Sequence, residues 1–265
     1  LKVEIVWKGP LKEDDLKQQV DLVESFTAQG VSGIVLAPLN DKALVKVVKD
    51  AKRAKIPTVV IDSALQGDHH ASFVATDNVA AGKLAGEYLA KLLGGKGKVV
   101  VLRYQEGSAS TANREKGFIE AAKAGGLTVV SDNQYAGATT ESAFSASESL
   151  LQAQKASDGD VDGIFTPNES TTFGMLRALR TAGLAGKVEL VGFDASDKLV
   201  EGLKAGDVSG LVLQDPFQMG YLGVKTMVQH LKGEKVEGSI DTGSVMVDAK
   251  NLDTPDVKRL LSPTP

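Results

Sequence analysis

The chain has 265 residues, of which 24% are charged and 42% hydrophobic, and its formal net charge is −4. This balance gives no indication of the basic surface that nucleic-acid binding requires. The chain has no cysteine, which excludes a disulfide framework and thiolate catalysis. No stretch of the sequence reaches the roughly 20 apolar residues of a membrane span.

Short apolar strands and amphipathic helices are expected to alternate along the chain. The expected strands lie at 1–7, 34–37, 58–61, 72–75, 98–104, 127–130, 163–166, 188–193, 209–213 and 239–247. The expected helices lie at 13–30, 41–54, 79–93, 112–124, 139–154, between 166 and 188, and at 197–205 and 217–231. We expect the tail from Asp248, with two prolines in its last three residues, to pack loosely. This alternation predicts an α/β fold of parallel sheets flanked by helices.

Two stretches of the chain, 33–64 and 163–196, repeat one strand–helix–strand pattern. The second strand of each stretch ends at an aspartate, Asp62 in the first and Asp194 in the second. In open parallel sheets, ligands bind beyond the carboxyl ends of the strands. The repetition therefore predicts two domains, each with an aspartate at its binding edge.

The repeat is incomplete at its front. The second half begins with a strand and a helix, 98–126, before the strand that matches the first seven residues of the chain. We therefore expect one strand and one helix to be missing from the first lobe, by truncation or because they belong to residues outside this sequence. An incorrect alignment of the halves is the third explanation. The chain also starts without Met or a signal peptide, as a processed product would.

Seven stretches carry a resemblance to a known family. They are IVLAPLNDKALVKVV, IPTVVIDSA, VATDNVAAGKLAGEYLAKLL, GSASTANREKGF, IFTPNESTTFGMLRAL, VGFDAS and LVLQDPFQMGYLGV. In this order they resemble the periplasmic sugar-binding proteins of ABC transporters, the ribose-binding-like group of type I periplasmic binding proteins. The resemblance implies two Rossmann-like lobes, 1–76 plus 215–241 and 77–214 plus 242–265, joined by a three-strand hinge that closes on one sugar.

The resemblance also implies the sugar-binding residues, which are Asp62, Arg114, Asn168, Asp194 and Gln214. Carboxylates and amides accept hydrogen bonds from sugar hydroxyls, and a guanidinium donates in a planar fork. Simpler roles remain open for each residue. The two aspartates and Asn168 could cap helices, Arg114 could lie on a solvated helix face, and Gln214 could serve the hinge.

Several further residues bear on which ligand this site would bind. Ser63, which follows Asp62, is also expected to bind the ligand, but it stands where the ribose-binding group often carries arginine, so ribose itself is in doubt. Glu106 and Glu169 would suit an amino sugar, or they are two surface acids. Trp7 could stack on a sugar ring, although a tryptophan in the core or at the lobe rim is more common. The pair His69-His70 suggests an exposed loop rather than a metal site, and no metal or cofactor is expected.

We expect a non-enzymatic receptor that captures a monosaccharide or similar polyol by hinge closure and presents its closed form to the membrane permease subunits of an ABC transporter. It would be a monomer in the periplasm or outside the cell, and this location is compatible with a lipid anchor. It would bind no nucleic acid. One alternative is the effector-sensing core of a LacI-type transcriptional regulator, which needs a helix-turn-helix that the sequence does not show. Another is a sugar-modifying enzyme, although no nucleophile elbow, phosphate loop or zinc motif is present.

Overall fold

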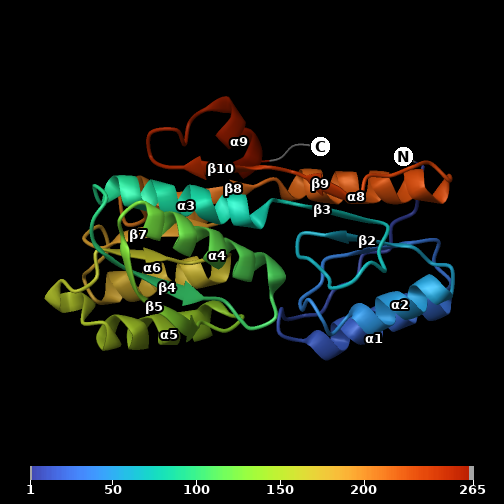
Figure 1. The fold of residues 1–265 in the computed structure, drawn as a ribbon, viewed down its shortest axis with the longest axis horizontal. Coiled ribbons are helices and arrows are strands. Elements are labelled where there is room, and N and C mark those ends of the chain that lie inside the picture. The colour runs from blue at the N-terminus through green and yellow to red at the C-terminus, as the bar shows by residue number, and fades with distance from the viewer. Residues whose placement is uncertain (1, 263–265) are drawn as a thin grey trace. The chain divides into compact units, whose positions relative to one another are not determined.

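A computed structural model describes residues 2–262, which divide into two compact units (Figure 1). The first unit takes in the residues up to Thr76, Gly107–Ser110 and Asp215–Thr242. The second takes in Asp77–Glu106, Thr111–Gln214 and the residues from Gly243 on. The units differ from the predicted lobes in two places, because Gly107–Ser110 and Thr242 pack with the first unit.

The first unit contains a parallel sheet of short strands, ordered β1-β2-β3-β9. These strands are β1 (Ile34–Leu36), β2 (Thr58–Ile61), β3 (Ser72–Ala75) and β9 (Ser239–Asp241). Side chains alternate between the two faces of a strand, so both faces of this sheet carry buried apolar residues. Helices α1 (Leu16–Gln29) and α2 (Val45–Arg53) cover one face, and α8 (Pro216–Leu231) covers the other (Figure 1).

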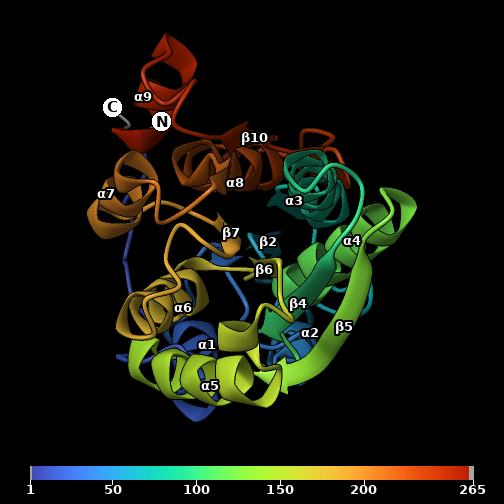
Figure 2. The ribbon, with the colours of Figure 1, turned by 90° about the vertical axis from the view of Figure 1, so that its left-hand side faces the viewer.

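The second unit contains a sheet ordered β10-β8-β7-β6-β4-β5, in which only the β10–β8 pair is antiparallel. The strands are β4 (Lys98–Arg103), β5 (Thr128–Tyr135), β6 (Gly163–Phe165), β7 (Glu189–Phe193), β8 (Gly210–Gln214) and β10 (Ser244–Val247). Helices α3 (Asn78–Leu92) and α4 (Ala109–Ala124) pack on one face. Helices α5 (Thr140–Ala153), α6 (Glu169–Thr181) and α7 (Asp197–Ala205) pack on the other (Figure 2).

The prediction of a strand at the front of the chain, residues 1–7, is wrong. Residues 2–10 form no helix or strand, and Val3, Ile5 and Trp7 are exposed, Trp7 by 87%. Within the described residues, no backbone hydrogen bond joins this segment to β1, which lies at the edge of its sheet. Alternating apolar residues make a strand only when a neighbouring strand pairs with them. Trp7 therefore belongs to no core, and Leu1 lies outside the described residues.

The end of the chain also differs from the prediction. The strand expected at 239–247 is two strands, β9 and β10, because Gly243 turns the chain with φ = 76°. The tail is not loosely packed, since Leu252 and Val257 are buried in the core of the second unit. It forms helix α9 (Pro255–Leu261), with proline at the first helical position, where its fixed φ suits a helix start. Residues 263–265 lie outside the described residues.

Helices α3 and α8 begin alike but have different surroundings. The side chains of Asp77 and Asp215 cap their first turns by accepting backbone N–H groups. Gly82 and Gly220 follow these caps at matching positions. A Cβ on Gly82 would lie 2.0 Å from the carbonyl oxygen of Arg114 on α4, whereas a Cβ on Gly220 would have no described atom within 4 Å. Helix α4 therefore packs closely on α3, and the matching face of α8 has no such neighbour among the described residues.

Candidate functional site

Each unit ends one strand in an aspartate with the same unusual backbone. Asp62 follows β2 and Asp194 follows β7, and both have φ = 65°, in the left-handed region. The backbone N–H of Asp62 donates to Val74 O at 3.1 Å, and that of Asp194 donates to Val212 O at 2.9 Å. The helix-capping alternative is wrong for both, because no helix lies between β2 and β3, and the N-cap position of α7 is Ser196 rather than Asp194. Both aspartates stand at the carboxyl edge of their sheet.

Arg114 is the centre of a polar network in the second unit. Its side chain is buried on α4, and the residue is 2% exposed. Nε donates to Asn78 Oδ1 at 2.8 Å, Nη1 to Pro167 O at 2.9 Å, and Nη2 to Gln214 Oε1 at 2.7 Å. The guanidinium carbon lies 4.1 Å from the centre of the Phe193 ring, a cation–π contact. The solvated-helix alternative for Arg114 is therefore wrong.

Gln214 connects this guanidinium to a carboxylate. Its Oε1 accepts from Arg114, which leaves Nε2 to donate to Asp194 Oδ1 at 2.6 Å. The amide orientation follows from the two partners, a cation on one side and an anion on the other. Three residues predicted for the site thus lie in one hydrogen-bonded chain, although they come from α4, the end of β8 and the position after β7.

Asn168 stands at the N-cap position of α6, but its side chain makes no capping hydrogen bond. Nδ2 donates to Ser170 Oγ at 3.1 Å. Oδ1 is buried and has no hydrogen-bond partner among the described residues. A buried acceptor without a partner costs about 1–3 kcal/mol. The capping alternative for Asn168 is wrong, and the orientation of its amide leaves an acceptor for another molecule.

Two members of the network were not predicted from the sequence. Asn78 begins α3 and is 6% exposed, and Phe193 ends β7 in the core. Asparagine is unusual as a buried residue, but nothing in the sequence shows that Asn78 is buried. Phe193 directly precedes Asp194, and this position next to a predicted site residue is the sequence signal that could have identified it.

A partly buried ion pair lies beside the network. Glu115 follows Arg114 on α4, and its Oε2 accepts from Arg103 Nε at 2.6 Å. Its Oε1 accepts from the backbone N–H of Tyr104 at 3.3 Å. Burial raises the pKa of Glu115 above its usual value, and Arg103 offsets part of this rise. The guanidinium of Arg103 also lies 4.7 Å from the centre of the Tyr135 ring.

The remaining predicted residues lie outside the Arg114 network. Ser63 is 4% exposed, and its Oγ accepts from the backbone N–H of Ser110 at 3.1 Å within the first unit. Glu106 is exposed in the turn after β4. His69 lies 3.5 Å from the carboxylate of Asp68, and no cluster of three or more candidate metal ligands occurs in residues 2–262.

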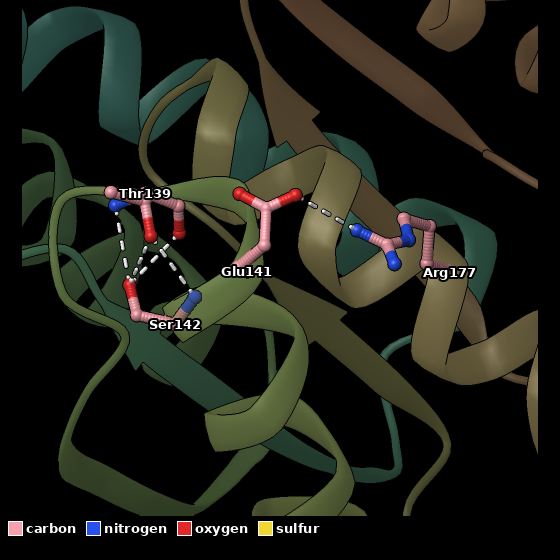
Figure 3. Close-up of polar contacts among 4 residues, drawn as sticks. All are labelled: Thr139, Glu141, Ser142 and Arg177. Atoms are coloured by element: carbon pink, nitrogen blue, oxygen red, sulfur yellow. Dashed lines mark hydrogen bonds and ion pairs between the residues drawn. The ribbon is translucent and has the colours of Figure 1, made fainter.

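Glu169 lines a separate cavity of about 430 Å³ in the second unit. The other lining residues come from the first turns of three helices and are Thr140, Glu141, Phe173, Ser196, Asp197 and Lys198. Glu141, one of these lining residues, pairs with Arg177 at 3.6 Å, and Thr139 and Ser142 cap α5 reciprocally (Figure 3). Of the two acids expected for an amino sugar, Glu169 thus lines this cavity and Glu106 is exposed in a turn.

The chain resembles known proteins along most of its length. A family model described as a periplasmic binding protein domain matches residues 1–235. The ribose import binding protein RbsB of Haemophilus influenzae is 34% identical over 86% of this chain and 76% of its own length. The D-ribose/D-allose-binding protein of Pseudomonas aeruginosa is 32% identical over 94% of this chain and 79% of its own.

Solved structures give the same result. An ABC transporter solute-binding protein from Agrobacterium vitis with bound D-fucose is 39% identical, with a TM-score of 0.91 over 98% of this chain and 89% of its own. A carbohydrate transporter solute-binding protein from Agrobacterium radiobacter in complex with D-arabinose is 33% identical. Its TM-score is 0.88 over 95% of this chain and 85% of its own. In residues 2–262, we find no helix with the length and apolarity to cross a membrane.

Proposed function

Since the chain belongs to the periplasmic binding protein family, we propose that it is the solute receptor of an ABC transporter and captures a monosaccharide or similar polyol. The observation that carries this proposal is the chain of hydrogen bonds from Arg114 through Gln214 to Asp194. The relatives support it, since they are named for ribose or allose or were solved with D-fucose or D-arabinose.

The network suits a ligand with several hydroxyl groups. Each hydroxyl donates one hydrogen bond, and the Asp194 carboxylate and Asn168 Oδ1 are acceptors at this edge of the sheet. Arg114 and Gln214 fix the direction of the carboxylate before the ligand arrives, which lowers the ordering cost of binding. Asp62 would supply the corresponding carboxylate of the first unit.

The charged and uncharged residues predicted for the site support one class of sugar over others. Ser63 gives the first unit no cation at the position after Asp62, where the resemblance implies an arginine for the ribose-binding group. Glu106 is exposed in a turn and Glu169 lines the cavity at α5, α6 and α7, positions that suit surface acids better than ligands of an amino sugar. We therefore favour a neutral monosaccharide other than ribose, or a neutral polyol.

The mode of action proposed here is hinge closure without chemistry. Ligand contacts made by both lobes would stabilise the closed form, and the permease subunits would recognise that form. The receptor would be a monomer in the periplasm or outside the cell, and this location is compatible with a lipid anchor. It would bind no nucleic acid, need no cofactor or metal and turn over no substrate. None of the relatives cited above is a transcriptional regulator or an enzyme.

A thermal-shift screen followed by calorimetric titration tests the proposal. The panel contains D-fucose, D-arabinose, D-allose, D-ribose and myo-inositol, with sucrose as the osmotic control. A ligand at one hundred times its dissociation constant stabilises the folded protein by about 2.7 kcal/mol. One or two neutral sugars should raise the melting temperature and bind with a stoichiometry of one. A folded protein that binds no member of a wider sugar and polyol panel would contradict the proposed function.

A further inference from the structure

We propose that Asn78 is a positioning residue, which fixes the guanidinium of Arg114 at the sheet edge of the second unit rather than contacting the sugar. Asn78 Oδ1 accepts from Arg114 Nε at 2.8 Å, and both residues belong to the second unit. The inference rests on the proposed function for its effect on sugar affinity, whereas the contact itself is a property of the ligand-free protein.

Asn78 is not needed to begin its own helix. The N-cap of α3 is Asp77, whose side chain accepts the backbone N–H groups of Val79 at 3.1 Å and Ala80 at 3.0 Å. The preceding residue therefore already supplies the polar side chain that a helix start favours. Asn78 is nevertheless only 6% exposed, and a buried amide costs free energy unless it is hydrogen-bonded. Its contact with Arg114 gives this buried amide a partner and a role.

The face of α3 that carries Asn78 lies against α4. Asn78, Gly82 and Gly86 follow one another at intervals of four residues, which places them on one side of the helix. A Cβ on Gly86 would lie 2.6 Å from Phe118 O, and one on Gly82 would lie 2.0 Å from Arg114 O. The two helices thus approach closely through glycine. Asn78 is the polar residue at the start of this face, within reach of the guanidinium.

The guanidinium of Arg114 is held on several sides. Asn78 Oδ1, Pro167 O and Gln214 Oε1 accept from Nε, Nη1 and Nη2 in turn, at 2.8, 2.9 and 2.7 Å. Because the group is planar and rigid, acceptors on three of its nitrogens fix its direction within the plane. The Phe193 ring, whose centre is 4.1 Å from the guanidinium carbon, fixes the tilt of the plane. Asn78 is the partner of Nε in this arrangement.

Asn78 differs from Gln214 in what else its side chain holds. Gln214 also donates to Asp194 Oδ1 at 2.6 Å, so it is shared with the carboxylate proposed to bind the sugar. Asn78 stands instead in the first turn of α3, on the face packed against α4. Without Asn78, a buried charged donor loses its acceptor, and the guanidinium turns toward another one. That turn would also move Gln214 and, through it, the carboxylate of Asp194.

The substitution Asn78→Ala removes the acceptor, and the Nε–H resonance of Arg114 reports the result in the ligand-free protein. The variant Arg114→Lys assigns that resonance in ¹⁵N spectra. In Asn78→Ala we expect the resonance to shift and its hydrogen to exchange with solvent roughly tenfold faster. D-fucose, D-arabinose and D-allose, where the wild type binds them, should lose affinity roughly three- to thirtyfold, at most the equivalent of one hydrogen bond to a charged group. Asn78→Asp keeps an acceptor and should restore both values to within about twofold.

The matched control is another asparagine with structural hydrogen bonds in the second unit. Asn251 Nδ2 donates to Met246 O at 2.9 Å, and its Oδ1 accepts from the backbone N–H of Asp248 at 2.9 Å. Asn251→Ala should lower the melting temperature but change neither the Arg114 resonance nor the sugar affinity. Thermal unfolding of each variant shows that it is folded before its affinity is measured.

The outcomes separate positioning from its alternatives. If Asn78 contacts the sugar itself, Asn78→Ala will weaken binding but leave the Nε–H of ligand-free Arg114 unchanged, which overturns the proposal. Wild-type affinity in Asn78→Ala overturns it as well, and so does an equal loss in Asn251→Ala, which would mean a general effect of stability. If the wild type binds none of the sugars, the proposed function is the part that fails. The Nε–H exchange rate then decides the contact alone.

Discussion

At the scale of single residues, the backbone conformation of Asp62 and Asp194 carries the clearest functional information. A left-handed conformation costs a residue with a side chain about 1–2 kcal/mol, although aspartate and asparagine tolerate it better than most. The same φ of 65° at the end of a strand in both units shows that the fold keeps these carboxylates at their sheet edges despite that cost. Strain of this kind is concentrated at functional sites.

The substitution Asp194→Asn tests the carboxylate without changing the backbone preference. We expect sugar binding to weaken by about 1–3 kcal/mol, because a charged acceptor is lost, while the melting temperature stays nearly unchanged. Asp194→Ala should weaken binding similarly but also destabilise the fold, since alanine tolerates the left-handed region poorly. Calorimetric titration and thermal unfolding measure the two effects. Asp256→Asn, in the first turn of α9, is the control, and full affinity in Asp194→Asn would remove Asp194 from the site.

Glu115 makes the stability of the protein depend on pH. Burial raises the folded-state pKa of Glu115 above its unfolded value of about 4.5. The folded state therefore binds the Glu115 proton more tightly than the unfolded state does. The resulting stabilisation of the folded state is fully present below the unfolded pKa and is lost as pH rises through the folded pKa. In urea titrations, the free energy of unfolding of the wild type, relative to Glu115→Gln, should fall as the pH rises above about 4.5. A difference that grows with pH would mean that Arg103 outweighs burial.

At the scale of elements, α3 and α8 are related helices placed in different surroundings. Both begin at an aspartate cap and carry glycine at the matching position, but only α3 has a helix packed against that glycine. Close approach of α4 to α3 brings the backbone of Arg114 onto Gly82, and so contributes to the position of the network. The same residue type therefore has a packing role in one helix and none among the described residues in the other.

A matched pair of substitutions tests this difference. Gly82→Ala would place a methyl group 2.0 Å from Arg114 O, so we expect a loss of stability of about 1–3 kcal/mol and weaker sugar binding. Gly220→Ala meets no described atom, and alanine in a helix interior should stabilise the protein by about 0.5–1 kcal/mol. Urea unfolding curves measure both. A destabilised Gly220→Ala would show that the face of α8 is occupied in the intact protein.

At the scale of the whole molecule, each unit has its own sheet and its own apolar core. The first unit packs two clusters around a sheet of four strands, and the second packs two larger clusters around a sheet of six. The smaller sheet buries less apolar area, so it contributes less stability from burial. Two cores of unequal size favour unfolding in two steps.

We therefore expect two transitions in urea without sugar, with the first unit unfolding at the lower concentration. A ligand held by both units should raise both midpoints and bring them together, because binding stabilises only the folded form of each. Circular dichroism of the whole chain follows the process, and the exchange of backbone amides in each sheet assigns a transition to its unit. If sugar shifts one transition alone, only one unit contributes to binding. A single transition without ligand would mean that the two cores unfold together.

The sequence by itself determined the alternation of strands and helices, the repeat, the family resemblance and the positions of Asp62 and Asp194. These features depend on apolar periodicity and on motifs that span a few residues. Only the tertiary structure decided which strands find partners and which polar groups meet. Residues 2–7 have a strand pattern but pair with no strand of the described residues, Arg114 meets Asn78 and Gln214 from distant segments, and Ser63 meets Ser110. Such contacts depend on the packing of elements far apart in the chain, which local patterns do not encode.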